Sequence, residues 1–150
     1  MKLSTRSRYG LRAAVELAAQ YGEAPLPLAA IAHRQEVSES YLEQLLRSLK
    51  AAGLVTAVRG INGGYRLTRP PEEISVREVL EALEGATVVA DCVGTEASVC
   101  ENACTCSARP LFLKLQSRIN AVLEETSLRE LTEDHMEQKR RIQDAKGISG

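Results

Sequence analysis

Hydrophobic residues recur at helical spacing through the first third of the chain. Residues 5–21, 28–35 and 39–52 carry apolar side chains three or four positions apart, the spacing of one buried helix face. Ser38 is a candidate N-cap for the third segment, and Gly53 follows its end, where helices commonly stop. Residues 54–68 then alternate around Gly60-Ile-Asn-Gly-Gly64, which predicts a β-hairpin.

The second and third predicted helices are separated only by a tight turn at Glu36-Val37, which is typical of a helix-turn-helix. A Gly-rich basic hairpin follows directly, so residues 1–71 are expected to form a winged helix-turn-helix domain. Helix-helix-hairpin patterns also occur in domains that bind protein. Charge favours DNA here, because residues 1–70 hold ten Lys/Arg against five Asp/Glu, although the whole chain has a net charge of −1.

The second half of the chain is acidic and is predicted to contain two further helices. Ser75 and Glu78 form a capping box that begins a helix over about 76–84. A longer helix is expected over about 109–125, and its apolar residues extend past one face, which indicates a second chain as partner. Residues 72–131 would hold a cysteine loop and this dimerisation helix, with one short turn at 127–131. Residues 132–150 are charged and poor in hydrophobes, so we expect a frayed or disordered tail.

The fold is therefore expected to be mostly α with a small β-hairpin wing. With one Phe, four Tyr and no Trp in 150 residues, its core must be built from aliphatic side chains. No secretory signal and no apolar run of about 20 residues is present, so a cytoplasmic location without a membrane span is expected. Two distant His, no P-loop and no nucleophile elbow argue against an enzyme.

All four cysteines lie between Cys92 and Cys106, spaced as Cys92-x7-Cys100-x3-Cys104-x-Cys106. Cysteines crowded into a polar loop indicate sulfur chemistry: an iron–sulfur cluster, a zinc site, or redox thiols and disulfides. Only Cys100-x3-Cys104 has the spacing of a zinc knuckle, and a reducing cytosol disfavours disulfides. The spacing therefore favours an iron–sulfur cluster and leaves the zinc site and the thiol switch open.

Several short motifs resemble one bacterial family: Ser-Arg-Tyr-Gly-Leu-Arg-Ala around Tyr9, Ser40-Tyr-Leu-Glu-Gln-Leu45, Gly63-Gly-Tyr-Arg-Leu67 and Ile74-Ser-Val-Arg-Glu-Val79. They are similar to those of the winged-helix regulators that include the cluster regulator IscR, the nitric-oxide sensor NsrR, the iron regulator RirA and the cysteine regulator CymR. The resemblance implies a homodimer crossing through the long helix. It also implies transcriptional regulation, as a repressor, on a palindromic double-stranded operator. CymR-like members lack the cluster ligands.

By the same resemblance, Cys92, Cys100 and Cys106 take the three cysteine positions of an IscR-type cluster. The histidine position falls at Arg109, which cannot ligate iron because its guanidinium does not deprotonate in proteins. Cys104 is the first candidate for the fourth ligand. Oxygen alternatives are Asp91, Glu96 and Glu101. The likeness to IscR favours a [2Fe-2S] cluster, with [4Fe-4S] as the alternative.

Candidate DNA contacts divide by role. Arg59 beside Gly60 suits a narrow minor groove, while Glu43 could accept from a cytosine amino group, reject wrong sites, or simply pair with Arg47. Tyr41 could reach DNA or belong to the core. The remaining candidates are phosphate contacts (Lys2, Arg6, Arg8, Lys50) and polar positions at the start or on the outer face of the helix over 39–52, the expected recognition helix (Ser38, Ser40, Gln44, Arg47).

Overall fold

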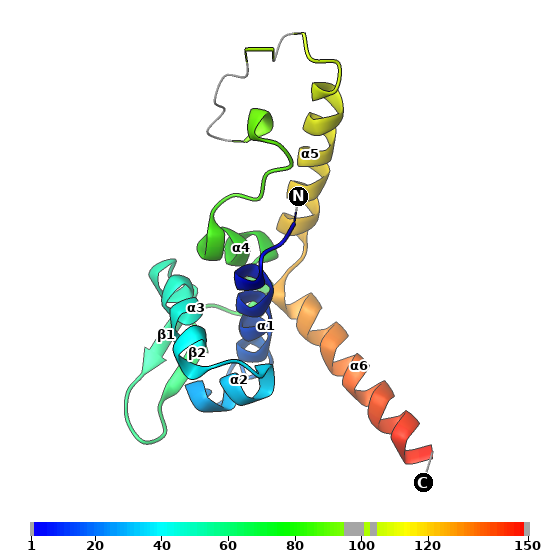
Figure 1. Ribbon diagram of the computed structural model, residues 1–150. Helices are drawn as coiled ribbons and strands as arrows, with labels where there is room; N and C mark the ends of the chain where they lie inside the picture. The colour runs from blue at the N-terminus through cyan, green and yellow to red at the C-terminus, as the bar shows by residue number, and fades with distance from the viewer. Residues whose placement is uncertain (1, 95–100, 103–104, 149–150) are drawn as a thin grey trace.

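The computed structural model describes residues 2–94, 101–102 and 105–148 (Figure 1). It confirms a mostly helical chain with one antiparallel hairpin. The elements are α1 (Thr5–Ala19), α2 (Leu28–Gln35), α3 (Glu39–Ala51), β1 (Val55–Val58), β2 (Gly64–Leu67), η1 (Pro71–Glu73), α4 (Val76–Glu84), η2 (Asp91–Val93), α5 (Arg109–Glu125) and α6 (Leu128–Ile148).

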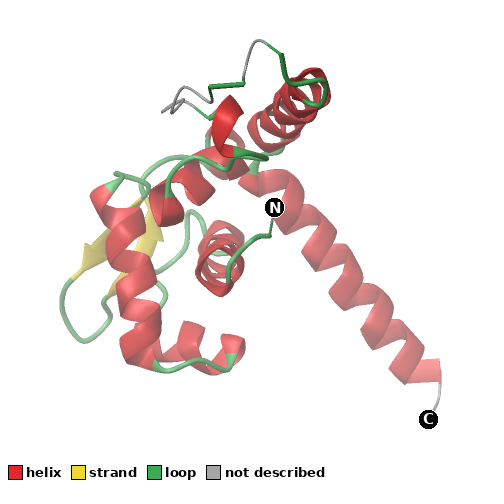
Figure 2. Cartoon of the chain, turned by 45° about the horizontal axis from the view of Figure 1, so that its top comes forward, coloured by secondary structure: helices red, strands yellow, loops and turns green. Residues whose placement is uncertain are grey.

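Helices α1 to α4 and the hairpin form one body, from which α5 and α6 extend in different directions (Figures 1 and 2). The core of this body is aliphatic, as the composition predicts, and Leu45, Leu46 and Leu49 of α3 are fully buried in it. Tyr41 is half-buried and packs edge-to-face on Tyr9, with ring centroids 6.3 Å apart. Tyr41 therefore belongs to the edge of the core, whatever else it contacts.

The hairpin is joined to the segment before α2 by a second set of backbone hydrogen bonds. Strands β1 and β2 pair in the register Val55↔Leu67 to Val58↔Gly64. Leu26, before α2, forms an isolated bridge with Tyr65, in which each amide donates to the other's carbonyl at 2.9 Å. Gly64 permits this approach, because a Cβ there would lie 2.3 Å from the Leu26 carbonyl oxygen. The wing is thus fixed relative to the helix-turn-helix.

Helix α4 begins at the predicted capping box. Ser75 Oγ accepts from the Glu78 amide at 3.2 Å, and the Glu78 carboxylate accepts from the Ser75 amide at 3.0 Å. Farther along, Leu83 packs against Gly10 of α1 so closely that a Cβ on Gly10 would lie 2.4 Å from Leu83 Cδ1. The glycine lets α1 and α4 cross at short distance, directly before residues 85–108, the cysteine segment that joins α4 to α5.

The structure differs from the prediction of a short turn at 127–131 and a frayed or disordered tail at 132–150. Leu128–Ile148 forms one continuous helix. Leu128 is fully buried, and its amide donates to the Ile74 carbonyl at 2.9 Å, which docks the helix start. Ser127 Oγ caps the Glu130 amide at 3.2 Å. Ion pairs four residues apart, such as Arg129–Glu133 and Arg141–Glu137, support the exposed remainder. The segment is poor in hydrophobic residues because most of the helix is exposed to solvent. The Ser127 cap, the ion pairs and the docking of Leu128 stabilise it as a helix.

Among the described residues, no helix has both the length and the apolar character that a bilayer crossing demands.

Candidate DNA-binding face and cysteine segment

Helix α3 presents one polar face, opposite its four buried leucines. Ser38 precedes it, and the Ser38 hydroxyl accepts from the Tyr41 amide at 3.1 Å, so this side chain serves as the N-cap. Of the predicted DNA-facing positions on the helix, Tyr41 is half-buried and the other five are exposed: Ser40, Glu43, Gln44, Arg47 and Lys50. The structure therefore brings these five candidates together on one open surface.

Glu43 lies beside Arg47, with 3.7 Å between carboxylate and guanidinium. This is the i,i+4 pair that was one of the alternatives for Glu43. Both side chains are more than half exposed, so the pair adds little to stability. Its effect is to lower the negative charge that Glu43 would present to a polyanion.

The three predicted phosphate contacts near the N-terminus differ in their surroundings. Arg6 is partly buried: its Nε donates to the Leu83 carbonyl at 2.8 Å and a terminal nitrogen donates to the Ser48 hydroxyl. Only its remaining N–H groups are available to DNA. Lys2 and Arg8 are exposed, and Arg8 makes one 3.4 Å bond to the Thr5 hydroxyl.

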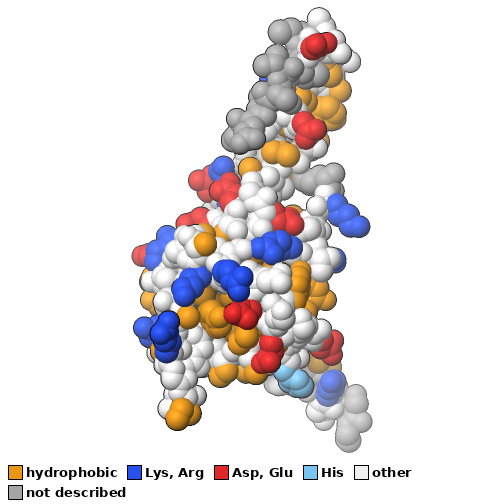
Figure 3. All heavy atoms as spheres, turned by 60° about the vertical axis from the view of Figure 1, so that its left-hand side comes forward, with side chains coloured by type: hydrophobic (Ala, Val, Ile, Leu, Met, Phe, Trp, Pro, Cys, Tyr) orange, Lys and Arg blue, Asp and Glu red, His pale blue; other side chains and the backbone are white. Residues whose placement is uncertain are grey.

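The wing adds a cation that the sequence analysis did not select. Arg66 lies on β2 opposite Thr56, and its side chain is exposed, whereas neighbouring Leu67 is buried. The alternation of β2 could have indicated it, because every second strand residue points outward. Arg59 and Gly60 are exposed as predicted. Figure 3 shows Lys and Arg side chains gathered on the face that carries α3 and the hairpin.

Cys92 lies in η2 and Cys106 lies just before α5, and both are partly buried free thiols. Cys100, Cys104 and Glu96 lie outside the described residues. Asp91 and Glu101, the other oxygen candidates, are exposed. Within residues 2–94, 101–102 and 105–148, no three potential ligand side chains come together. The complete ligand set therefore stays a prediction.

Arg109, at the predicted histidine position, is the first residue of α5, and its amide donates to the Cys106 carbonyl at 3.3 Å. Its side-chain Nε is buried and has no hydrogen-bond partner in the described part of the chain. An unpartnered buried cationic N–H is costly unless an acceptor or anion lies near it. A cluster bound by thiolates carries such negative charge, so this donor, on the residue three positions after Cys106, fits an iron–sulfur site. Arg109 would be a charge partner there, since it cannot ligate metal.

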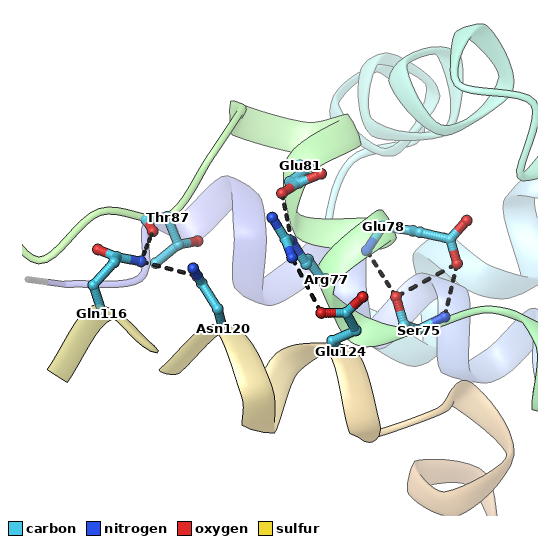
Figure 4. Close-up of polar contacts among 8 residues, drawn as sticks. All are labelled: Ser75, Arg77, Glu78, Glu81, Thr87, Gln116, Asn120 and Glu124. Atoms are coloured by element: carbon cyan, nitrogen blue, oxygen red, sulfur yellow. Dashed lines mark hydrogen bonds and ion pairs between the residues drawn. The ribbon is translucent and has the colours of Figure 1, made fainter. Parts of the chain in front are cut away.

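The segment leading to Cys92 is fastened to α5 by one buried amide side chain. Gln116 Oε1 accepts from the Val89 amide at 2.8 Å. Its Nε2 donates to the Thr87 carbonyl and to Asn120 Oδ1, both at 2.9 Å (Figure 4). Gln116 is only 8% exposed. Sequence reasoning missed it, because a polar residue within an amphipathic helix carries no sign that it will be buried.

Helix α4 connects this segment to α1 and α3 of the body. Arg77 bridges Glu81 on its own helix and Glu124 of α5, at 2.8 and 3.3 Å (Figure 4). At the end of α4, Glu84 accepts from the hydroxyls of Ser4 and Ser7, the latter at 2.7 Å. These hydrogen bonds, from Ser4 first and Ser7 second, hold the pKa of Glu84 below its ordinary value. The beginning of α1 is thus attached to the last residue of α4, directly before the cysteine segment.

Comparison with known proteins identifies relatives along nearly the whole chain. The Rrf2 family profile, described as "Iron-dependent Transcriptional regulator", matches residues 3–134. The HTH-type transcriptional regulator IscR of Aliivibrio salmonicida is 42% identical over 135 residues, covering 90% of this chain and 79% of the relative. The HTH-type transcriptional regulator CymR of Bacillus subtilis is 37% identical over 131 residues, covering 87% and 89%.

Solved structures point to the same two kinds of regulator. CymR, "the Global Cysteine Regulator of B. subtilis", superposes with a TM-score of 0.76 at 36% identity, covering 89% of this chain and 97% of that one. IscR of T. potens superposes with a TM-score of 0.73 at 36% identity, covering 90% and 88%. Since the matching family and these relatives are transcription regulators, the prediction that the chain is not an enzyme is confirmed.

Proposed function

Since the chain belongs to the Rrf2 family of DNA-binding transcription regulators, we propose that it is a cytoplasmic, homodimeric repressor whose operator affinity depends on an iron–sulfur cluster. The ligands would be Cys92, Cys100, Cys106 and Cys104, and the cluster a [2Fe-2S] centre. The observation that carries the proposal is the position of the cysteine segment. It begins directly after α4, which is attached to the DNA-binding helices, and it is fastened to α5 by Gln116.

The dimer would form through α5. Leu111, Leu113, Leu115 and Val122 are 41–62% exposed on this helix, which extends away from the body. Exposed leucines at this density on one helix favour burial against a second copy. A two-fold axis through α5 would present two α3 helices and two wings to a palindromic operator.

On DNA, α3 would lie in the major groove with its exposed polar face toward the bases. Arg47 and Gln44 would reach base edges, while Lys50 and the N-terminal Lys2 and Arg8 would contact phosphates. Arg59 at the wing would enter the adjacent minor groove. This division places affinity in the phosphate contacts and sequence information in α3 and the wing.

The cluster, when bound, would supply a redox- and iron-sensitive crosslink between distant points of the loop. Cys92 stands two residues beyond Ala90, close to the backbone that Gln116 holds, and Cys106 stands three residues before α5. Ordering the loop would therefore set the position of α4 relative to α5. Through Glu84 and Arg6, the same shift would reach α1 and α3, where coupling energies of about 1–3 kcal/mol are usual for allosteric sites.

Anaerobic purification with quantified iron and sulfide tests the cluster. A visible charge-transfer absorbance with equal iron and sulfide is expected, whereas a colourless protein that contains zinc would contradict it. Serine at Cys92, Cys100 or Cys106 should abolish stable cluster binding. Cys104→Ser should retain iron at first and lose it faster in air, because a harder hydroxyl replaces a soft thiolate. A wild-type lifetime in that variant would assign the fourth position to another donor, such as Glu101.

The competing function is a repressor of the same fold that uses its cysteines as a zinc site or thiol switch. The similarity to CymR supports it, since the chain resembles CymR nearly as closely as IscR. Titrating operator affinity against a thiol oxidant in iron-free protein separates the two. A reversible change of affinity without iron would favour the thiol switch.

A further inference from the structure

The end of the wing carries a hydrophobic side chain that no part of the described structure covers. Ile61 follows Gly60 in the turn between β1 and β2, and it is fully exposed, at 104% of its reference area. A fully exposed branched aliphatic residue contributes nothing to the core, and it costs solubility. Its placement in the turn that joins β1 to β2, at the end of the hairpin, makes it available to a ligand.

The turn that carries Ile61 is built to hold one shape. The Gly63 amide donates to the Gly60 carbonyl at 3.0 Å, and a Cβ on Gly63 would lie 2.1 Å from the Val58 carbonyl oxygen. The Thr68 hydroxyl donates to the Gly53 carbonyl at 2.6 Å, which joins the end of the hairpin to the end of α3. Ile61 is therefore presented at a fixed distance from the recognition helix.

Charge around the hairpin identifies the class of ligand. Arg59 and Arg66, both exposed, lie on its two strand sides, and no acidic residue lies between positions 44 and 71. In Figure 3 the protruding lobe ends in hydrophobic atoms, and Lys or Arg atoms lie farther up the same side of the molecule. If the tip bound a protein, further apolar side chains of the wing would be expected around Ile61. A cationic rim with a single apolar point instead matches a DNA groove, whose sugar walls are apolar and whose edges are anionic.

We infer that Ile61 is a specificity-determining residue that excludes G·C pairs from the minor groove beneath the wing. The inference rests on the proposed position of the wing in that groove. In the minor groove, G·C differs from A·T by the guanine N2 amino donor. Ile61 would cover this donor without accepting from it, and a buried donor without an acceptor is costly. A·T pairs present only acceptors there, which Arg59 can satisfy.

Replacing G·C with inosine·C removes the amino group and leaves the major groove unchanged, so it isolates the contact. The duplex is one selected by the wild-type chain from a random pool, with single G·C or I·C pairs placed at each position flanking the major-groove half-site. Dissociation constants are measured at fixed salt for the wild type, Ile61→Ala, Ile61→Leu and Ile142→Ala. Ile142 is also exposed, at 56%, but lies on α6 and serves as the matched control.

The wild type should bind the I·C duplex about tenfold more tightly than the G·C duplex at one flanking position, the scale of one unsatisfied buried donor. Ile61→Ala should reduce this ratio to about threefold or less, because the space lets water bond the amino group. Ile61→Leu and Ile142→Ala should keep the wild-type ratio. An Ile61→Ala ratio that stays above threefold overturns the inference, as does a wild-type ratio near one at every flanking position.

Arg59→Ala separates failure of this inference from failure of the wing assignment. If Arg59→Ala weakens binding and lowers the salt dependence while Ile61→Ala keeps the discrimination, the wing occupies the groove and only the role of Ile61 is wrong. If neither variant changes affinity and the wild type ignores all flanking pairs, the wing itself does not contact DNA.

Discussion

Gln116→Leu should destabilise the junction between the cysteine segment and α5. Leucine has similar volume but cannot bond to the Thr87 carbonyl or the Val89 amide, which Gln116 contacts at 2.9 and 2.8 Å. The bond to Asn120 is lost as well. The substitution therefore removes the described side-chain hydrogen bonds that tie residues 87–89 to α5, while α5 itself keeps its backbone bonds and its apolar surface.

The expected loss follows from those three contacts. Each hydrogen bond contributes a net of about 0.5–1.5 kcal/mol, and a buried backbone group left without a partner costs about 1–3 kcal/mol. Thr87 and Val89 are only half-buried, so water can replace part of each bond. Burying leucine in place of the amide offsets about 1 kcal/mol. The free energy of unfolding should fall by about 2 kcal/mol.

Urea unfolding at fixed protomer concentration measures this loss, because the stability of a dimer depends on concentration. Gln143→Leu, the same change at an exposed position of α6, should stay within about 0.5 kcal/mol of the wild type. Asn120→Ala should cost about 1 kcal/mol or less, since it removes one bond of the three. In the proposed holoprotein, Gln116→Leu should also lose visible absorbance faster in air. Wild-type stability together with a wild-type cluster lifetime would refute the role assigned to Gln116.

Three further outcomes are expected. The double substitution Leu115→Asp and Ile119→Asp should give monomers or aggregate, because it buries charge in the proposed dimer contact. Sedimentation measures this, and an intact dimer would show that the dimer helix is misassigned. Arg59→Ala should weaken operator binding by about 1–3 kcal/mol and lower the slope of affinity against salt by about one. Arg12→Ala, which removes a cation–π contact 5.1 Å from the Tyr9 ring centroid, should weaken operator binding less. Equal losses of affinity at fixed salt would contradict the wing assignment. Glu84→Gln should destabilise the protein at neutral pH, because the folded pKa of Glu84 is lowered. The gap to the wild type should close as pH falls through that folded pKa, below the ordinary value of about 4.3, and a gap independent of pH would exclude this linkage.

The elements that the sequence predicted correctly are those whose ends are encoded locally. Helices over 28–35, 76–84 and 109–125 have the expected bounds, and α1 and α3 end within two residues of expectation. Ser38 and the Ser75–Glu78 box cap their helices with contacts only three residues apart, so neighbouring residues suffice to predict them. The hairpin followed equally from its Gly-rich turn.

The features that the sequence did not reveal depend on contacts between distant segments. Helix α6 begins at Leu128, whose amide donates to the carbonyl of Ile74, a residue 54 positions earlier in the chain. Gln116 becomes important only because residues 87–89 pass over it. Arg6 looked like a free cation until folding placed the Leu83 carbonyl and the Ser48 hydroxyl beside its guanidinium. Hydrophobic periodicity predicts which face of a helix is apolar, but it does not predict which polar groups from distant segments will contact each other.

In the proposed mechanism, the end of α4 is the point at which a signal from the cysteine segment would reach α1 and α3, the two helices proposed to contact DNA. The Leu83 carbonyl accepts from Arg6, which also donates to Ser48 of α3, and Glu84 accepts from Ser4, the N-cap of α1, and from Ser7 within it. Gly10 keeps α1 in direct contact with the same turn, so α1 cannot stay fixed when Leu83 moves. Because packed interfaces switch between discrete arrangements, a shift at Thr87, three residues after Glu84, would be transmitted to the relative position of α1 and α3. A thermodynamic cycle that combines Glu84→Gln with Cys92→Ser measures this link. Operator-affinity changes that simply add would mean that cluster and DNA communicate by another route.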